Sequence, residues 1–197
     1  MLAPGFADPV FDSQQAFRCV MDAMARPGTV RSLAMPLVPP AGLPHAAAAV
    51  LLFLCDYETP VWLAPSLARR DGVSGYVRFH TGAPITQDMS AAHFAFADAA
   101  QDPLDLAAFA QGTPEYPDRA ATVIILCGAL TGGDPLLVSG PGTRACLSIA
   151  PQGLQSGFAD QLKSNHARFP LGVDVLLIAG ASMLALPRST RVTREAR

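Results

Sequence analysis

The run AATVIILCGAL, residues 120–130, constrains the fold of this chain most. Its β-branched and apolar side chains favour a strand and stand at successive positions, which predicts a central strand covered on both faces. The longest apolar runs of the chain extend over about ten residues, too few to span a bilayer. The sequence therefore predicts a sheet with helices packed on it, an α/β fold, and no membrane partner.

The clearest helix is expected near the N-terminus. Asp12 is positioned to cap it, and Gln15 three residues later completes a capping-box pattern. Pro27 and Gly28 are expected to end it. Apolar side chains recur at i, i+3, i+4 and i+7, and this predicted buried face consists of Phe17, Val20, Met21 and Met24.

The remaining elements follow from periodicity and from turn residues. Further helices are predicted over 44–55, 74–84, 103–112 and 153–169. Further strands are predicted over 59–64, 93–98, 135–142, 173–180 and 183–187. The last two strands are expected to form a hairpin, and GGD before residue 135 also suits one. The charged tail RVTREAR is expected to fray. This order predicts one α/β domain, 1–197, with a mixed sheet of about six strands flanked by helices.

The composition bears on partners. Only 15% of the residues are charged, fewer than in ordinary soluble domains, so we expect another subunit to cover part of the surface. A net charge of -2 argues against a nucleic-acid partner held by phosphate contacts. The N-terminus has no signal-peptide pattern, which predicts a cytoplasmic protein. The cysteines lie in apolar runs and are predicted to be buried free thiols: Cys19, Cys55, Cys127 and Cys146.

Motifs for common chemistries are missing from the sequence. The four histidines have no helical ligand spacing and the cysteines are not grouped, so no metal site is expected. No phosphate-binding glycine loop and no serine-hydrolase elbow occur. A pyridoxal enzyme needs a Schiff-base lysine, and the single lysine, Lys163, lies among polar neighbours typical of a solvated helix face. No catalytic residue and no cofactor are therefore predicted.

The arginines and one histidine near turns remain as candidates for an anion site or a subunit contact, because the guanidinium fork suits carboxylates and phosphates. The simpler interpretation is that each pairs with a nearby acid, as Arg18 could with Asp22 at i, i+4. Arg26 and Arg78 are the pair most suited to converge on one anion. The candidates are Arg18, Arg26, Arg78, His80 and Arg188.

Six segments in a fixed order make the chain resemble a known family, PhnH, the H subunit of the bacterial carbon–phosphorus lyase system. They extend over most of the sequence. The segments are QQAFRCVMDAMARPG (14–28), DYETPVWL (56–63), RFHTGAP (78–84), GTPEYPDRAATVI (112–124), FPLGVDVLL (169–177) and LPRST (186–190).

The resemblance implies a fold similar to that of pyridoxal-phosphate-dependent transferases, without the cofactor. It implies a homodimer that joins a core complex with the G, I and J subunits. That complex supports formation of ribose 1-phosphonate 5-triphosphate from a nucleoside triphosphate and an alkylphosphonate. The family has no established catalytic residues in this subunit, so none is transferred to this chain.

Three hypotheses follow. The first is a supporting subunit of the complex that is not catalytic alone. The second is a stand-alone binder or transferase of small anions, phosphonate or phosphate, which requires a shared basic pocket built from Arg26, Arg78, His80 and Arg188. The third, a true pyridoxal enzyme, requires an aldimine absorbance band after the protein is soaked with the cofactor.

Overall fold

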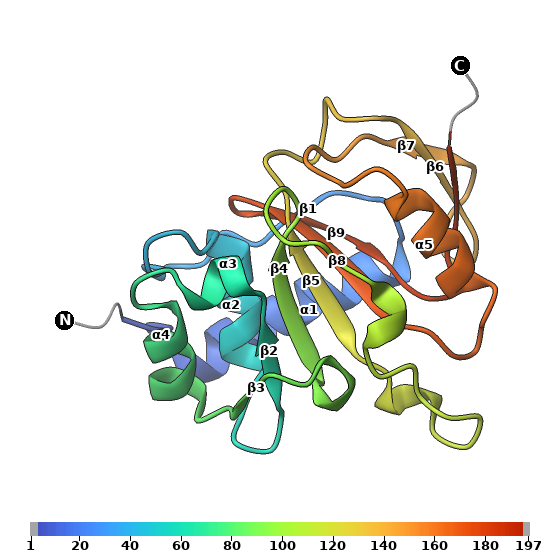
Figure 1. Ribbon diagram of the computed structural model, residues 1–197. Helices are drawn as coiled ribbons and strands as arrows, with labels where there is room; N and C mark the ends of the chain where they lie inside the picture. The colour runs from blue at the N-terminus through green and yellow to red at the C-terminus, as the bar shows by residue number, and fades with distance from the viewer. Residues whose placement is uncertain (1–3, 195–197) are drawn as a thin grey trace.

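A seven-stranded mixed sheet organises the protein in this computed structural model, which describes residues 4–194 (Figure 1). The strand order is β1-β9-β8-β5-β4-β2-β3. Strands β8, β5, β4, β2 and β3 are parallel, β9 is antiparallel to β8, and β1 is antiparallel to β9. The strands are β1 (Arg31–Ser32), β2 (Val61–Leu63), β3 (Ile85–Thr86), β4 (Phe94–Asp98), β5 (Thr122–Leu126), β8 (Asp174–Ala179) and β9 (Ser182–Leu186).

The C-terminal half of the chain also forms a separate antiparallel sheet of three strands, in the order β10-β6-β7. It consists of β6 (Leu136–Ser139), β7 (Leu147–Ile149) and β10 (Arg191–Arg194). The helices are α1 (Pro9–Ala25), α2 (His45–Leu54), α3 (Pro65–Ala68), α4 (Val73–Thr81) and α5 (Phe158–His166), with short 3-10 turns η1 (Met89–Ala91), η2 (Leu106–Ala108) and η3 (Pro117–Arg119). The α/β prediction is confirmed, but ten strands in two sheets replace the single sheet of about six.

The predicted central strand is confirmed as β5, which lies between β4 and β8. Alternate side chains of a strand point to opposite faces of the sheet, and the side chains of β5 alternate between two hydrophobic cores. Ile124 and Leu126 enter the core beneath α1, α2 and α4. Val123 and Ile125 enter a second core, beneath η2, α5 and the smaller sheet. Burial on both faces explains why the run contains so little polarity.

Seven other predicted elements also form: the helices α2 and α4 and the strands β2, β4, β6, β8 and β9, the last two as the predicted hairpin. Gly82 ends α4 in the left-handed conformation, at φ 68°, as helices commonly end. By contrast, the GGD hairpin is wrong, because β5 and β6 belong to different sheets and β6 turns into β7 instead. The tail prediction is wrong for Arg191–Arg194, which pairs with β6 as β10. The rest of the tail lies outside the described residues.

Helix α1 begins earlier than predicted, and the prediction of its buried face is only partly right, because Val20 is buried and Met24 packs partly buried against the core. Asp8, not Asp12, is its N-cap and accepts a hydrogen bond from the Phe11 amide at 3.0 Å. Phe17 and Met21 are 52% and 51% exposed. The buried positions are Asp12, Ala16, Val20 and Ala23. Alanine side chains let the helix axis approach β9 closely, so the face with the smaller side chains is the one that packs on the sheet.

Two predicted helices are shorter than expected. Over 103–112 only the turn η2 forms, because side chains occupy the backbone groups that a helix would use. Gln111 donates to the carbonyls of Leu106 and Phe109 at 2.8 and 2.7 Å, and the Asp105 carboxylate accepts from the Ala107 amide at 2.9 Å. Over 153–169 the helix begins only after Gly157, whose φ of 91° is outside the helical range.

All four thiols are free, but they differ in exposure. Cys55 and Cys127 are buried as predicted, Cys19 is half-buried, and Cys146 is exposed in the segment before β7, which corrects the prediction for that residue. Burial raises the pKa of Cys55 from 9.0 to about 12, with a further contribution from Asp56. Burial likewise raises the pKa of Cys127 to about 12, assisted by the charge of Asp98.

We expect iodoacetamide to label Cys146 quickly at about pH 8, whereas Cys55 and Cys127 react only after denaturation, because the thiolate is the nucleophile and burial suppresses it. Peptide mass spectrometry over time measures the order. Because both thiols ionise less readily in the folded protein than in the unfolded chain, they contribute to the free energy of unfolding, and this contribution is fully present below about pH 9. That contribution is lost as the pH rises from about 9 through 12, because the unfolded chain ionises first. Equal labelling rates for Cys146 and Cys55 in the folded protein would contradict the assignment.

No helix within the described residues has the length and apolar character needed to cross a membrane.

Candidate functional site

The fold itself indicates where a ligand would bind. Open α/β sheets take ligands at the carboxyl ends of parallel strands, where successive connections leave toward opposite faces. In this chain that point lies between β2 and β4. The segment after β2 packs on the helical face through Leu67 and Tyr76. The segment after β4 packs on the other face through Leu104 and Phe109. We call the space between these two strand ends the switch-point crevice.

A carboxylate of the chain itself occupies the switch-point crevice. Asp102 is 3% exposed and accepts hydrogen bonds from the backbone amides of Ser66 and Asp98, each at 3.1 Å. The Ser66 hydroxyl donates to the same carboxylate. The Asp102 carboxylate therefore occupies the place where a ligand would bind, and it accepts the hydrogen bonds that Ser66 and Asp98 could otherwise donate to that ligand.

An ion pair lies at the end of β4, beside the crevice. The Arg70 guanidinium lies 2.5 Å from the Asp98 carboxylate, and their side chains are 23% and 17% exposed. Arg70 also donates to the carbonyl oxygen of Gly42, and Gln101 donates to Asp98 at 3.2 Å. The charges and donors at this edge are therefore paired with one another.

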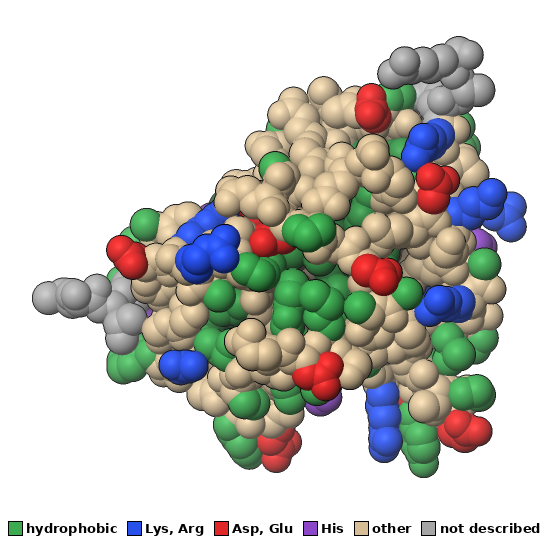
Figure 2. Space-filling view, in the orientation of Figure 1, with side chains coloured by type: hydrophobic (Ala, Val, Ile, Leu, Met, Phe, Trp, Pro, Cys, Tyr) green, Lys and Arg blue, Asp and Glu red, His purple; other side chains and the backbone are tan. Residues whose placement is uncertain are grey.

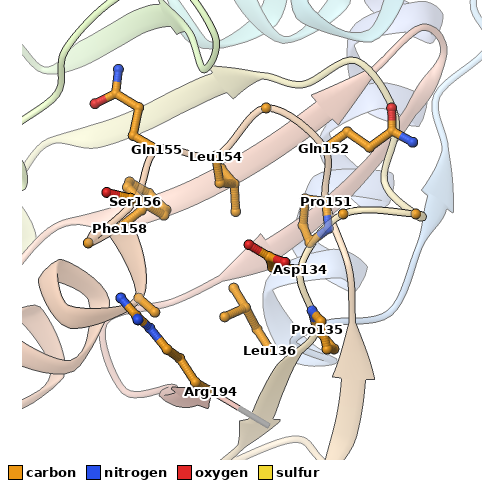
Figure 3. A pocket seen from close by; sticks show the side chains of 15 residues that line it. Asp134, Pro135, Leu136, Pro151, Gln152, Leu154, Gln155, Ser156, Phe158 and Arg194 are labelled. Carbon is orange, nitrogen blue, oxygen red and sulfur yellow. The ribbon is translucent and has the colours of Figure 1, made fainter. Parts of the chain in front are cut away.

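A wide cleft has a volume of about 1010 Å³ (Figure 3), and Gln155 in its lining donates to the carbonyl oxygen of Asp102 at 2.7 Å. The loop over 132–136 and the loop over 151–157 form its walls, and Arg194 comes from the end of β10. Asp134 and Arg194 point into it from different sides (Figure 3). Arg194 also pairs with Asp160 of α5 at 2.9 Å. The described residues that line the cleft include no histidine, cysteine or lysine, the side chains on which proton transfer and nucleophilic attack most often depend.

The candidates on α1 carry different partners. Arg26 follows the last helical residue and pairs with Asp22, one turn earlier. The Asp22 carboxylate also pairs with Arg31 of β1, so it serves Arg26 and Arg31 instead of the Arg18 predicted for it. Arg18 is exposed midway along the helix. Arg26, at 56% side-chain exposure, remains accessible to a partner.

Arg78 and His80 lie in the last turn of α4. His80 packs against the rings of Tyr76 and Phe79, with centroids 4.4 and 4.9 Å away. Its imidazole lies near the backbone of Gly5, shortly before α1 begins. Arg26 lies at the other end of α1, and a helix of 17 residues spans about 25 Å. The structure therefore does not bring Arg26 and Arg78 together.

Arg188 has a structural role at the amino ends of the parallel strands, the end of the sheet opposite to the crevice. Its guanidinium pairs with Asp174, the first residue of β8, at 2.5 Å, and donates to the carbonyl oxygen of Pro117. The Arg188 amide also donates to Asp174 at 2.9 Å. Local pairing accounts for this arginine. The shared basic pocket required by the anion-binding hypothesis is not formed by the four candidates.

The face of the molecule drawn in Figure 2 also shows no gathering of basic side chains among the residues that the structure describes. In Figure 2, hydrophobic side chains gather in a hollow over β4 and β5, and the Lys and Arg side chains lie scattered around it. No group of three or more His, Cys, Asp and Glu side chains within residues 4–194 is arranged to hold a metal ion.

The outer face of α1 is the feature that the sequence pattern misplaced. Large apolar side chains lie along it in solvent, and the Phe17 ring meets that of Phe53 from α2 edge-on, with centroids 6.5 Å apart. Contiguous exposed apolar surface usually marks an interaction site. We define the outer face of α1 by its exposed residues Val10, Phe11, Phe17 and Met21.

Comparison with known proteins gives consistent matches over almost the whole length. The sequence model of a family described as "Bacterial phosphonate metabolism protein (PhnH)" matches residues 4–193. A curated protein of Rhizobium meliloti (strain 1021), "Alpha-D-ribose 1-methylphosphonate 5-triphosphate synthase subunit PhnH", is 44% identical over 190 residues, covering 96% of this chain and 94% of that protein. "Putative C-P lyase subunit protein HtxG" of Stutzerimonas stutzeri is 31% identical over 187 residues, covering 91% of this chain and 85% of that protein.

Proposed function

Because the chain belongs to the PhnH family of bacterial phosphonate metabolism proteins, we propose that it is a subunit of a carbon–phosphorus lyase complex. The names of the two relatives support this, since one is a subunit of a ribose 1-methylphosphonate 5-triphosphate synthase and the other a putative C-P lyase subunit. Within that complex it supports transfer of a ribose triphosphate unit from a nucleoside triphosphate to an alkylphosphonate.

In this proposal the subunit is not catalytic alone. The observation that carries this part is the closed switch-point crevice, where Asp102 already accepts the hydrogen bonds of Ser66 and Asp98. The only lysine, Lys163, is exposed on α5, whereas a pyridoxal enzyme needs a lysine that forms a Schiff base with the cofactor. A likeness to pyridoxal-phosphate-dependent transferases without the cofactor is therefore part of the proposal.

The proposed partners are a second copy of the chain and the G, I and J subunits, in the cytoplasm. The outer face of α1 is the surface we assign to contact with another subunit of the complex. Its apolar side chains leave water on binding, and aromatic side chains at the centre of an interface commonly provide most of the affinity. The low charge content of the chain, 15%, fits a surface that is partly covered in the assembly.

The test is assembly with intact folding. We expect tagged wild-type protein to capture the G, I and J subunits on co-expression, and the double variant Phe17→Ser/Met21→Ser to bind them at least about 30-fold more weakly. Its denaturation midpoint should stay close to that of the wild type, because both side chains are half exposed already. Affinity capture and transfer to methylphosphonate in the reconstituted complex measure the two effects.

Phe169→Ser is the matched control, since Phe169 is 57% exposed but follows α5 rather than lying on α1. It should leave capture unchanged. A wild-type protein that captures none of these subunits would overturn the proposed function, whereas normal capture by the double variant would overturn only the assigned surface.

A further inference from the structure

We propose that Asp102 is an internal anionic ligand of the switch-point crevice, and that the donors around its carboxyl group form an anion site that binds a small carboxylate ion such as formate once the side chain is removed. The inference goes beyond the proposed function, because it assigns an anion site to this chain whichever subunits it joins.

The geometry of the donors supports a built anion site. Three hydrogen-bond donors from the ends of two strands meet on one carboxylate: the Ser66 amide, the Ser66 hydroxyl and the Asp98 amide. Ser66 and Asp102 are 7% and 3% exposed, so water has little access to the carboxylate. Several hydrogen bonds to the charged form are what stabilise a buried carboxylate that has no cation beside it. Within residues 4–194, Asp102 forms no ion pair.

The surrounding charges allow a free ion to replace the side chain. Asp98 is the nearest other acid, and Arg70 pairs with it at 2.5 Å. Asp102→Ala removes one negative charge and one carboxyl group, and formate restores both with the same three heavy atoms. The bound ion would meet no more repulsion than the native carboxylate does. Without it, the buried donors of Ser66 and the partly buried Asp98 amide lose this acceptor, which is costly.

The experiment is rescue of Asp102→Ala by sodium formate, measured as the thermal denaturation midpoint against sodium chloride of equal ionic strength. We expect the midpoint of the variant to rise with formate along a saturating curve and to recover most of its loss, as mass action requires for a ligand that binds only the folded state. The wild-type midpoint should not change. Acetate, which is larger by a methyl group, should rescue less than formate.

Two variants show whether the rescue is specific to this site. Asp12→Ala removes another buried carboxylate, 5% exposed, which among the described residues accepts from the Asp8 amide at 3.1 Å. With a single donor in place of three, it should gain nothing from formate. Ser66→Ala/Asp102→Ala lacks the hydroxyl donor and should need more formate for the same rise.

Equal midpoints of Asp102→Ala in formate and chloride would overturn the proposal, as would the same rise in Asp12→Ala. If Asp102→Ala does not fold in chloride, the refolding yield in the two salts replaces the midpoint as the readout. A higher yield in formate supports the proposal, and equal yields, including none in either salt, overturn it.

Discussion

Gly142→Ala is expected to lower the free energy of unfolding by about 3 kcal/mol or more, a loss typical of severe steric changes. Gly142 lies in the turn between β6 and β7 with φ at 82°, where a side chain adds strain of about 1–3 kcal/mol. A Cβ atom there would also overlap the carbonyl oxygen of Ala25 and come within 3.1 Å of Pro27 Cδ. The turn packs on the end of α1, and backbone atoms on both sides cannot move independently.

Gly157→Ala separates the two causes. Gly157 has a similar φ of 91°, but no atom lies within 4 Å of the position its Cβ would take. This variant should show the conformational strain alone, a loss of about 1 kcal/mol. Urea denaturation of both variants measures the difference. Equal losses would mean that the approach of the turn to α1 contributes nothing.

Arg188→Ala is expected to cost about 3 kcal/mol, near the lower end of the range for breaking a buried ion pair. The guanidinium and the Asp174 carboxylate are only 14% and 15% exposed. Removing Arg188 leaves that carboxylate with its charge poorly compensated and the Pro117 carbonyl without this donor. Chemical denaturation measures the loss, and because the pair lies far from the crevice, formate should not reverse it.

Arg26→Ala is the control for Arg188→Ala. It also deletes a guanidinium from an ion pair, but Arg26 and Asp22 are 56% and 38% exposed, and Asp22 keeps Arg31. The expected change is within about 0.5 kcal/mol. A loss as large as that of Arg188→Ala would show that Arg26 is a structural residue rather than one left accessible for a partner.

The elements that the sequence predicts correctly are those whose pattern has one dominant physical cause. β5 is apolar at successive positions because both of its faces are covered, and the β8–β9 hairpin joins two apolar strands through a short turn at Gly180 and Ala181. The predicted face of α1 is wrong at two of its four residues, because hydrophobicity alone does not tell a core from an interface. Phe17 and Met21 are as apolar as core residues, yet Ala16 and Ala23 are the ones at 0% exposure.

The crevice shows the same limit. Asp98 is the last residue of a predicted strand and Asp102 follows four residues later, a signal that is available in the sequence. Nothing in the spacing identifies Ser66, 36 residues away, as the partner of Asp102, because that contact depends on β2 and β4 being neighbours. The order of strands in the sheet, set by long-range packing, is what the sequence does not reveal.

The pairing of β1 with β9 has a consequence for how the chain is made. Arg31 pairs with Met183, and α1 packs on β9 as well, so the first helix meets this strand only after the chain up to Ser182 has been made. At 5–20 residues per second, the roughly 150 residues between Arg31 and Ser182 take about 8–30 s to synthesise. Throughout that interval the face of α1 that packs on β9 is without this strand, while the early-made α2 is present to contact α1, through Phe53 and Phe17. The nascent chain is therefore expected to need a chaperone most while it is still on the ribosome.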